Sequence, residues 1–299
     1  MKRPQQSTSA NAMTVDVEDY YQVAAFEDVV ERDSWRHRES RVRRNTNRIL
    51  ALFDDAGIDA TFFVLGWVAE HHPEIVADIV SAGHEIGSHG YSHRLIYDQT
   101  PEEFRSETER SRKLLQDLSH QQVNGYRAAS YSITRRSLWA LDVIADVGFT
   151  YDSSIFPIVH DRYGMIGGPT GVHTLELKDR ELKEFPLNFA QVGKVRLPIS
   201  GGGYFRLYPY ALTRSLLERC SGNGPFVFYI HPWEIDPDQP RLPGRLLSRF
   251  RHYNNLGRCE ARLRQLLQDF RFTGMERVIR STSHDGRRFA VSGYEKDVA

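Results

Sequence analysis

The sequence predicts an α/β fold in which parallel strands alternate with helices. Short apolar runs rich in Val, Ile and Phe, such as 60–66 and 225–231, are typical of buried strands. Amphipathic segments with helix start and stop residues lie between such runs from residue 11 to residue 154. At 299 residues the chain has the length of one β/α barrel, and no internal repeat divides it.

The first half of the chain shows the clearest alternation. A buried strand that ends in acidic residues is expected at 11–21, followed by a helix that begins at an Asn cap, Asn45, and stops at Gly57. After the strand at 60–66, a second helix starts at Pro73. The remaining elements of this half are a strand at 84–89, a helix at 100–118, a strand at 123–127, a helix at 134–148 and a strand at 149–154. Strands and helices in this rhythm form parallel β/α units.

The second half alternates less regularly. Gly and Pro are dense between 155 and 208, and the pattern resumes with a helix at 209–220, the strand at 225–231 and an amphipathic helix at 257–272. We expect a disordered N-terminal segment at 1–11, one domain at 12–275 and a C-terminal tail at 276–299.

Composition excludes several classes of protein. With 39 basic and 39 acidic residues, the chain lacks the basic footprint of a nucleic-acid binder. No apolar run approaches the ~18 residues that a membrane span needs. Cys220 and Cys259 are far apart and form no CxxC motif, which favours a reducing compartment over a disulfide scaffold. Because the start, MKRPQQSTSANA, has no apolar signal-peptide core, a cytoplasmic location is expected.

Polar side chains gather where the predicted strands end. In chain order they are Asp16, Glu18, Asp19, His89, His93, Arg127, Asp152 and His231. Each has an ordinary explanation alone, such as a capped turn or a surface histidine pair. Because the carboxyl ends of parallel strands converge on one rim of a barrel, we expect these side chains to form one site.

The types of side chain at these ends predict metal-assisted hydrolysis. His89 and His93, four residues apart, match with one carboxylate a divalent-metal site that keeps a position open for water. Such a metal lowers the pKa of water towards ~7 and polarises a carbonyl group. Glu18 shares a strand face with Asp16, whereas a turn at residue 18 would deliver Asp19 instead, so both remain candidates for the third ligand. Zn suits this set best, although Co, Ni or Fe also fit.

Five motifs resemble the polysaccharide deacetylase family (NodB homology, carbohydrate esterase family four). They are TVDVED, HEIGSHGYSH, YRAASYS, YDSSIFP and FYIHPWEID, in the family's order, and the resemblance covers about residues 12–275. Within about 201–275, GGGYFRLYPY, HPWEIDPDQPR and FRHYNNLGR resemble the branch linked to exosortase (PEP-CTERM) exopolysaccharide loci. The resemblance implies a deformed (β/α) barrel, with seven β/α units expected, and a C-terminal extension.

The resemblance also implies a role for each site residue. Asp16 would be the general base paired with Arg127, His89 and His93 would hold the metal, and His231 would be the general acid oriented by Asp152. Asp19 is preferred over Glu18 as third ligand because its shorter side chain matches the family's ligand. A backbone amide near Ser130 would face the oxyanion, and Tyr131 and Trp233 would line the sugar pocket.

The chain departs from the family pattern in two places. Asp16 and Asp19 are separated by two residues, where the family has adjacent aspartates. Ala129 and Ser130 stand where many members have Pro and Tyr, and the missing Pro predicts a more mobile oxyanion loop.

The expected function is metal-dependent removal of acetyl groups from N-acetylated amino sugars in an exopolysaccharide, an oligosaccharide or a precursor of these. The alternatives are hydrolysis of another C–N bond, as in allantoinase-like relatives, O-deacetylation of an ester, or saccharide binding without catalysis.

Overall fold

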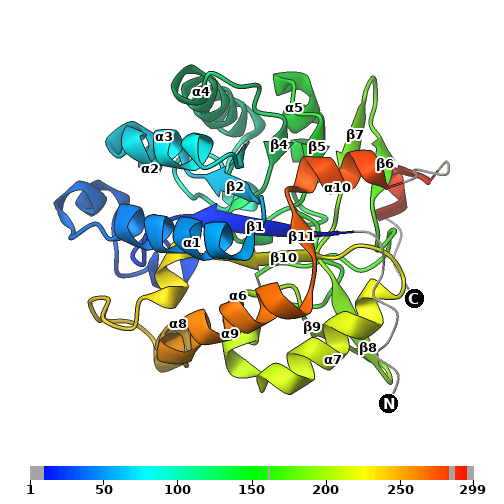
Figure 1. Ribbon diagram of the computed structural model, residues 1–299. Helices are drawn as coiled ribbons and strands as arrows, with labels where there is room; N and C mark the ends of the chain where they lie inside the picture. Colours follow the sequence, from blue (N-terminus) through cyan, green and yellow to red (C-terminus); the bar gives the residue numbers. More distant parts are fainter. Residues whose placement is uncertain (1–9, 161, 283–286, 295–299) are drawn as a thin grey trace, which may run out of the picture.

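A mostly parallel sheet runs through the molecule, and helices cover its outside (Figure 1). The computed structural model describes residues 10–160, 162–282 and 287–294. Seven neighbouring strands of these ranges are parallel and follow the order β10–β1–β2–β3–β4–β5–β7. They are β1 (Asn11–Val17), β2 (Thr61–Val64), β3 (Glu85–Ser88), β4 (Gly125–Tyr126), β5 (Tyr151–Asp152), β7 (Glu181–Glu184) and β10 (Val227–Ile230). The predicted α/β fold is confirmed.

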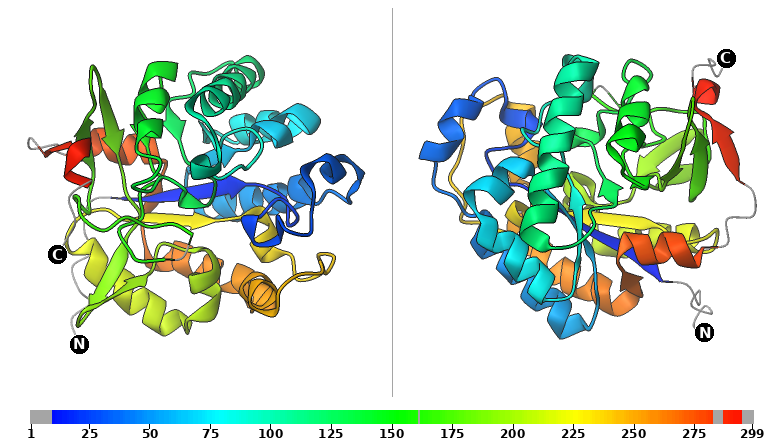
Figure 2. Two further views of the ribbon diagram at one scale, coloured as in Figure 1. Left: turned by 180° about the vertical axis from the view of Figure 1, so that it is seen from behind. Right: turned by 90° about the horizontal axis from the view of Figure 1, so that it is seen from above.

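The helices form a ring around the strands (Figure 2). From the first half come α1 (Val42–Ala56), α2 (Gly66–His71), α3 (Pro73–Ser81), α4 (Pro101–Ser119) and α5 (Trp139–Val147). From the second half come α6 (Gly202–Leu207), α7 (Tyr210–Ser221), α8 (Leu246–Tyr253), α9 (Leu256–Asp269) and α10 (Met275–Ser281). Within the ring α5 packs on α4, α4 on α3, α3 on α1, α1 on α9 and α9 on α7. None of the described helices has the length and apolar content to cross a membrane.

Shorter elements complete the described ranges. The remaining strands are β6 (His173–Glu176), β8 (Phe189–Val192), β9 (Val195–Pro198), β11 (Phe272–Thr273) and β12 (Arg288–Ala290). The 3₁₀ helices are η1 (Ala24–Phe26), η2 (Arg32–His37), η3 (Ile96–Asp98), η4 (Ala129–Tyr131), η5 (Pro232–Ile235) and η6 (Val291–Tyr294). β6 pairs antiparallel with β7, and β8 with β9, in the region where the sequence pattern loses its regularity.

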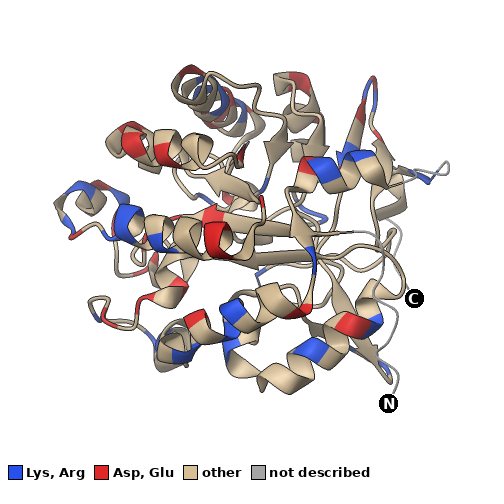
Figure 3. Ribbon diagram, viewed as in Figure 1, with Lys and Arg blue, Asp and Glu red and all other residues tan. Residues whose placement is uncertain are grey.

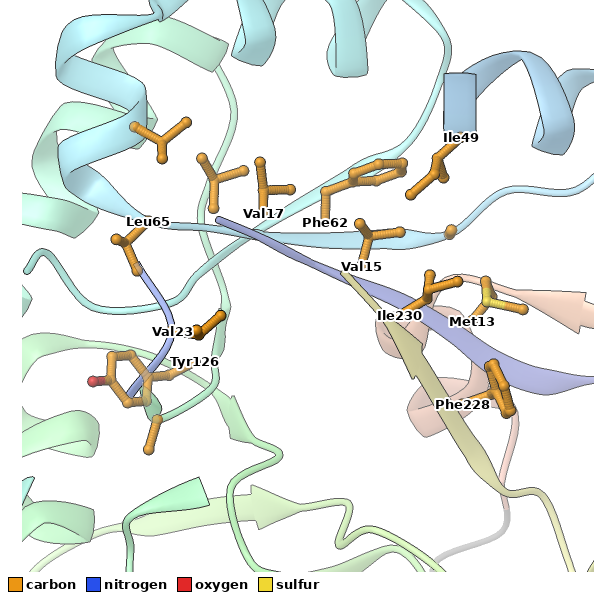
Figure 4. Close-up of a cluster of buried hydrophobic side chains, with 14 of the residues drawn as sticks. Met13, Val15, Val17, Val23, Ile49, Phe62, Leu65, Tyr126, Phe228 and Ile230 are labelled. Carbon is orange, nitrogen blue, oxygen red and sulfur yellow. The ribbon is translucent and has the colours of Figure 1, made fainter. Parts of the chain in front are cut away.

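The core lies on both sides of β1. Met13, Val15 and Val17 point into a cluster with Phe62 of β2, Ile230 of β10 and Ile49 of α1 (Figure 4). Burial of such side chains contributes about 1.5–3 kcal/mol each, which holds β1 between β10 and β2 and places the residues after Val17 at its carboxyl end.

Side-chain and loop contacts, rather than a strand ladder, connect the segment after β7 to β10. The side-chain oxygen Oδ1 of Asn188 accepts a hydrogen bond from the Val227 N–H at 2.8 Å, and the backbone N–H of Asn188 donates to Ser200 Oγ at 2.7 Å. The Tyr229 N–H donates to the Ser200 carbonyl at 2.7 Å. Gly201, at φ +134°, is required there because a Cβ would lie 1.9 Å from the Tyr229 carbonyl oxygen. These contacts, with an isolated bridge between Gly201 and Tyr229, join the two segments where no named strand continues the sheet.

The segments predicted at the two chain ends lie partly within the described residues. Of the segment predicted to be disordered, residues 1–9 lie outside the described ranges, but Asn11 begins β1 and its side chain donates to the Arg271 carbonyl at 3.1 Å. Of the predicted tail, residues 283–286 and 295–299 lie outside. The rest is folded, because α10 packs against β1 and β12 extends the sheet beside β6.

Candidate active site

The carboxyl ends of the parallel strands open into one cavity of about 550 Å³. The predicted site residues that line it are Asp16, Glu18, His89, His93, Ser130, Tyr131, His231 and Trp233. Arg127 lies next to Asp16, fully buried. Asp19 and Asp152 make their contacts elsewhere. The expectation that strand-end residues converge is therefore met by all but two of them.

Glu18, His89 and His93 form a candidate metal centre. One ligand atom of each residue lies within 4.8 Å of those of the others, and all three side chains are buried. Glu18 Oε2 lies 2.8 Å from His93 Nε2, yet it has no hydrogen-bond partner within the described ranges, and neither has His93 Nδ1. A buried carboxylate oxygen that approaches an imidazole nitrogen without hydrogen-bond geometry fits two ligand atoms converging on a shared cation.

Neighbouring groups set the orientation and the protonation state of two of these ligands, His89 and Glu18. His89 Nδ1 lies 2.9 Å from the Arg127 carbonyl oxygen, which places the ring proton on Nδ1 and leaves Nε2 as the ligand atom. Burial lowers the pKa of His89 to about 4, so the ring is neutral near pH 7, as a ligand must be. Burial opposes the charge on Glu18, but the neighbouring His93 outweighs it and lowers the pKa of Glu18 to about 2. The Trp233 indole N–H donates to Glu18 Oε1 at 3.1 Å. The donor set fits a divalent cation.

The preference for Asp19 as third ligand is wrong. Its Oδ2 accepts hydrogen bonds from the backbone amides of Arg41 at 2.7 Å and Val42 at 3.1 Å, and from Ser40 Oγ at 3.0 Å. Asp19 thus caps the N-terminus of α1 from a distant part of the chain. The physical reason is that the strand ends at Val17, so the chain turns after it and only Glu18 stays on the cavity side with Asp16.

The predicted helix start is also wrong. α1 begins at Val42 rather than at an Asn45 cap, and the Asn45 side chain donates to Asp236 Oδ2 at 3.1 Å instead. The prediction assumed a capping residue adjacent to the helix in sequence, whereas the cap is supplied by the distant Asp19.

We expect Asp19→Ala to lower the free energy of unfolding by about 1–2 kcal/mol, the usual effect of losing an N-cap, and to leave cation binding intact. The matched variant Glu18→Ala should lose the cation. Urea unfolding of the cation-free proteins and elemental analysis of the loaded ones measure the two effects. An Asp19→Ala protein that no longer binds a cation would contradict the assignment.

Asp16 and Arg127 form a buried ion pair beside this centre. Arg127 Nη1 donates to Asp16 Oδ1 at 2.7 Å and to Thr14 Oγ1 at 2.7 Å, and its other nitrogens bond to Ser153. The Tyr131 hydroxyl donates to Asp16 Oδ2 at 3.3 Å. The predicted pairing of Arg127 with Asp16 therefore matches the structure, and these hydrogen bonds fix the position of the carboxylate in the cavity.

His231 lies opposite, and a residue that sequence reasoning missed holds it. Its Nδ1 lies 2.8 Å from Glu234 Oε1, and its Nε2 lies 3.6 Å from Glu18 Oε1. Arg206, 1% exposed, donates from Nε to Glu234 Oε2 at 2.6 Å. The sequence signal was the His-x-x-Glu spacing of a capping box at the start of η5.

The prediction that Asp152 orients His231 is wrong. Asp152 accepts two hydrogen bonds from Ser154, at 2.6 Å and 3.1 Å, and lies beside Glu184. Burial raises the pKa of Glu184 well above its usual range and also raises that of Asp152, so the two carboxyl groups share a proton. This pair stabilises the loop after β5 rather than an imidazole.

The predicted sugar-pocket residues lie in the cavity in different ways. Ser130 and Tyr131 both have positive φ, at +50° and +53°, in a tight loop that lines it. Trp233 is 6% exposed and stacked between His231 and His252, with ring centroids 5.1 Å and 4.1 Å away. Trp233 lines the cavity, but with only 6% of its surface exposed it offers little area for stacking on a sugar. The outer wall includes aromatic side chains not predicted, Tyr163 and Tyr204 among them.

Comparison with known proteins divides the chain into two matched regions. Residues 25–151 match the family model described as polysaccharide deacetylase, and residues 153–280 match a domain of unknown function, DUF3473. The chain is 32% identical over 108 residues to a peptidoglycan deacetylase of Helicobacter pylori, which covers 36% of each protein. It is 36% identical over 74 residues to a peptidoglycan-N-acetylglucosamine deacetylase of Bacillus cereus, covering 25% of this chain and 27% of the relative. The matches thus span about a third of the curated relatives' length.

Two solved structures share the fold over nearly the whole chain. One is a Mycobacterium smegmatis protein assigned as a polysaccharide deacetylase, with a TM-score of 0.59, 21% identity and coverage of 94% of this chain and 92% of that one. The other is the allantoinase Puue, with a TM-score of 0.58, 14% identity and coverage of 93% and 91%. Since the two scores are nearly equal, the fold alone does not choose between their reactions.

Proposed function

We propose that this protein is a metal-dependent hydrolase that removes acetyl groups from N-acetylated amino sugars, since residues 25–151 match the family model described as polysaccharide deacetylase. The observation that carries the proposal is the position of a carboxylate, Asp16, and an imidazole, His231, in one cavity with the candidate metal centre. Amide hydrolysis needs these three parts: a base for water, an acid for the amine and a positive centre for the oxyanion.

Each side chain then has a defined task. Glu18, His89 and His93 would hold the cation, for which Zn²⁺ is best suited while Co, Ni or Fe also fit. When bound, the cation activates water and polarises the acetamide carbonyl. Asp16, held by Arg127, takes the proton from the attacking water. The backbone amide at Ser130 donates to the oxyanion, and His231, held by Glu234, protonates the departing amine.

The substrate we propose is an N-acetylated saccharide of an exopolysaccharide or its precursor. Support for an acetamido sugar comes from the relatives, which include a chitooligosaccharide deacetylase of Bradyrhizobium that is 27% identical over 100 residues, 33% of this chain and 43% of that protein. Support for an exopolysaccharide comes from the resemblance of segments such as FRHYNNLGR to the exosortase-linked branch.

The test measures cation content and acetate release from N-acetylglucosamine oligomers in parallel. We expect His89→Ala to lose both, because two remaining ligands do not hold a catalytic cation, whereas the exposed His37→Ala should keep both. O-acetylated oligosaccharide and allantoin serve as competing substrates. Hydrolysis of either of these in place of the N-acetyl oligomer would contradict the proposed reaction. A wild-type protein that binds the saccharide, but binds no cation and releases no acetate, would indicate a binding module.

The pH profile tests the pairing of His231 with Glu234. Burial lowers the pKa of His231, but the hydrogen bond to Glu234 and the charge of Glu18 outweigh burial and raise it to about 9. A general acid must be protonated, so activity should fall as pH rises through that pKa. In Glu234→Gln the imidazole loses a negative neighbour, and the alkaline limb of the kcat/KM profile should move to lower pH. The exposed Glu102→Gln is the control, and an unmoved limb in Glu234→Gln would refute the pairing.

A further inference from the structure

The helix α8 presents its apolar face to the outside. Leu246, Leu247 and Phe250 are 82%, 59% and 56% exposed. At 100° per residue, His252 lies roughly 200° around the helix from Phe250, and it is buried against Phe26 and Trp233 at ring distances of 5.0 Å and 4.1 Å. A surface helix ordinarily turns its apolar side to the core, so α8 has the reverse arrangement.

The chain around α8 carries positive charge. Between Gln239 and Cys259 there is no Asp or Glu, while the basic residues of this stretch are Arg241, Arg245, Arg249, Arg251 and Arg258. Figure 3 shows the basic positions along α8 at the lower left of the molecule. Arg245 is paired with the exposed Asp28 at 3.2 Å. Arg249 and Arg251 have no ion-pair or hydrogen-bond partner for their side chains among the described residues.

α8 also borders the mouth of the catalytic cavity. Leu247, Phe250 and Arg251 line the cavity, and the half-exposed Leu207 of α6 continues its apolar edge. Leu246, the most exposed of the apolar side chains, is not part of the lining. Binding of a saccharide in the cavity therefore does not explain why the apolar side chain of Leu246 is exposed. We infer that another ligand covers the outer face of α8.

We propose that α8 docks the protein on an anionic lipid surface. A helix with large apolar side chains on one face and arginines beside them binds at the headgroup boundary, with the apolar atoms inserted and the guanidinium groups on lipid phosphates. Charge complementarity favours this occupant over a second copy of the chain, because a symmetric dimer through α8 would bring two basic segments together. In the docked protein the mouth of the cavity, which α8 borders, lies next to the membrane surface.

Vesicle flotation of the full chain tests this docking without using enzyme activity. The protein should float with phosphatidylcholine vesicles that contain roughly a third phosphatidylglycerol, much less with pure phosphatidylcholine, and less as salt is raised. Arg249→Ser should weaken binding about fivefold, and Leu246→Ser about tenfold. Leu212→Ser, at a 43% exposed leucine on α7, is the matched control and should bind as the wild type does.

A second measurement locates the inserted side chain. With brominated lipids, Leu246→Trp should show strong fluorescence quenching beyond that of the wild type, whereas Leu212→Trp should not. Circular dichroism confirms that each variant is folded. Absence of flotation with anionic vesicles at low salt, unchanged flotation of Leu246→Ser, or a dimer that Leu246→Ser dissociates in place of vesicle binding would each overturn the docking. Because no acetate is measured, the proposed deacetylase function stands or falls separately.

Discussion

Replacing Asp16 with Asn is expected to lower kcat/KM for acetate release by about 10²–10⁴-fold while the cation content stays unchanged. The amide has nearly the shape of the carboxylate but does not accept a proton from water. Asp16 is not among the three side chains that form the candidate metal centre, so removal of its charge does not remove a ligand. The effect should lie in kcat rather than KM, because proton transfer belongs to the transition state.

The substitution leaves Arg127 buried without its charged partner, so a folding control is needed. Near-ultraviolet circular dichroism should match the wild type, since Ser153 and Thr14 still accept hydrogen bonds from the guanidinium group. The exposed Asp33→Asn provides the matched variant. Wild-type turnover in Asp16→Asn would remove Asp16 from the role of base, and loss of the cation would show that it belongs to the metal centre.

The largest effect on stability is expected for Arg206→Met. Arg206 pairs with Glu234 and donates to the backbone carbonyls of Arg251, His252 and Asn254 at 2.7–3.0 Å. Truncation leaves the buried Glu234 carboxylate with only the His231 imidazole as an ion-pair partner and removes the donor of three backbone carbonyls, a loss that we expect to cost about 3–5 kcal/mol. Urea unfolding measures this loss, and Arg214→Met on the exposed face of α7 should change little.

A double variant separates loss of the ion pair from loss of packing. In Arg206→Met with Glu234→Met the carboxylate that Arg206 neutralised is removed and His231 keeps Glu18 as an acidic neighbour, so the protein should regain much of the stability lost in Arg206→Met alone. If the double variant is as unstable as the sum of the two single variants, the backbone carbonyls rather than Glu234 account for the role of Arg206.

The residues that converge on the cavity could be predicted because strand ends can be read from sequence. The carboxyl ends of β1, β3 and β10 can be placed from the sequence pattern. The polar residues at those ends, Asp16 within β1 and His89 and His231 directly after β3 and β10, must then reach the same rim. The same reasoning does not decide between Glu18 and Asp19, because the turn after Val17, not the strand period, sets which carboxylate faces inward.

The partner of His231 could not be predicted for a different reason. Asp152 and Glu234 both follow strands, but only the side-chain contacts decide which one reaches the imidazole. The contact between β10 and the segment after β7, near Gly201, could not be predicted either. It depends on hydrogen bonds of Asn188 and Ser200 in a segment with neither helical nor strand periodicity. The capping of α1 by Asp19 could not be predicted for the same reason, because it depends on a contact between residues far apart in the sequence.

The position of Arg206 limits how the two matched regions of this protein can evolve. Arg206, His231 and Glu234 all lie in the region matched to the domain of unknown function, whereas His89, His93 and Arg127 lie in the region matched to the polysaccharide deacetylase model. Asp16 and Glu18 precede both regions, and neither region contains all the side chains assigned to the proposed reaction. A genetic exchange that replaced one region with a relative's would have to restore the ion pair, the imidazole and the sheet contacts in a single event, so the two regions are expected to be inherited as one unit.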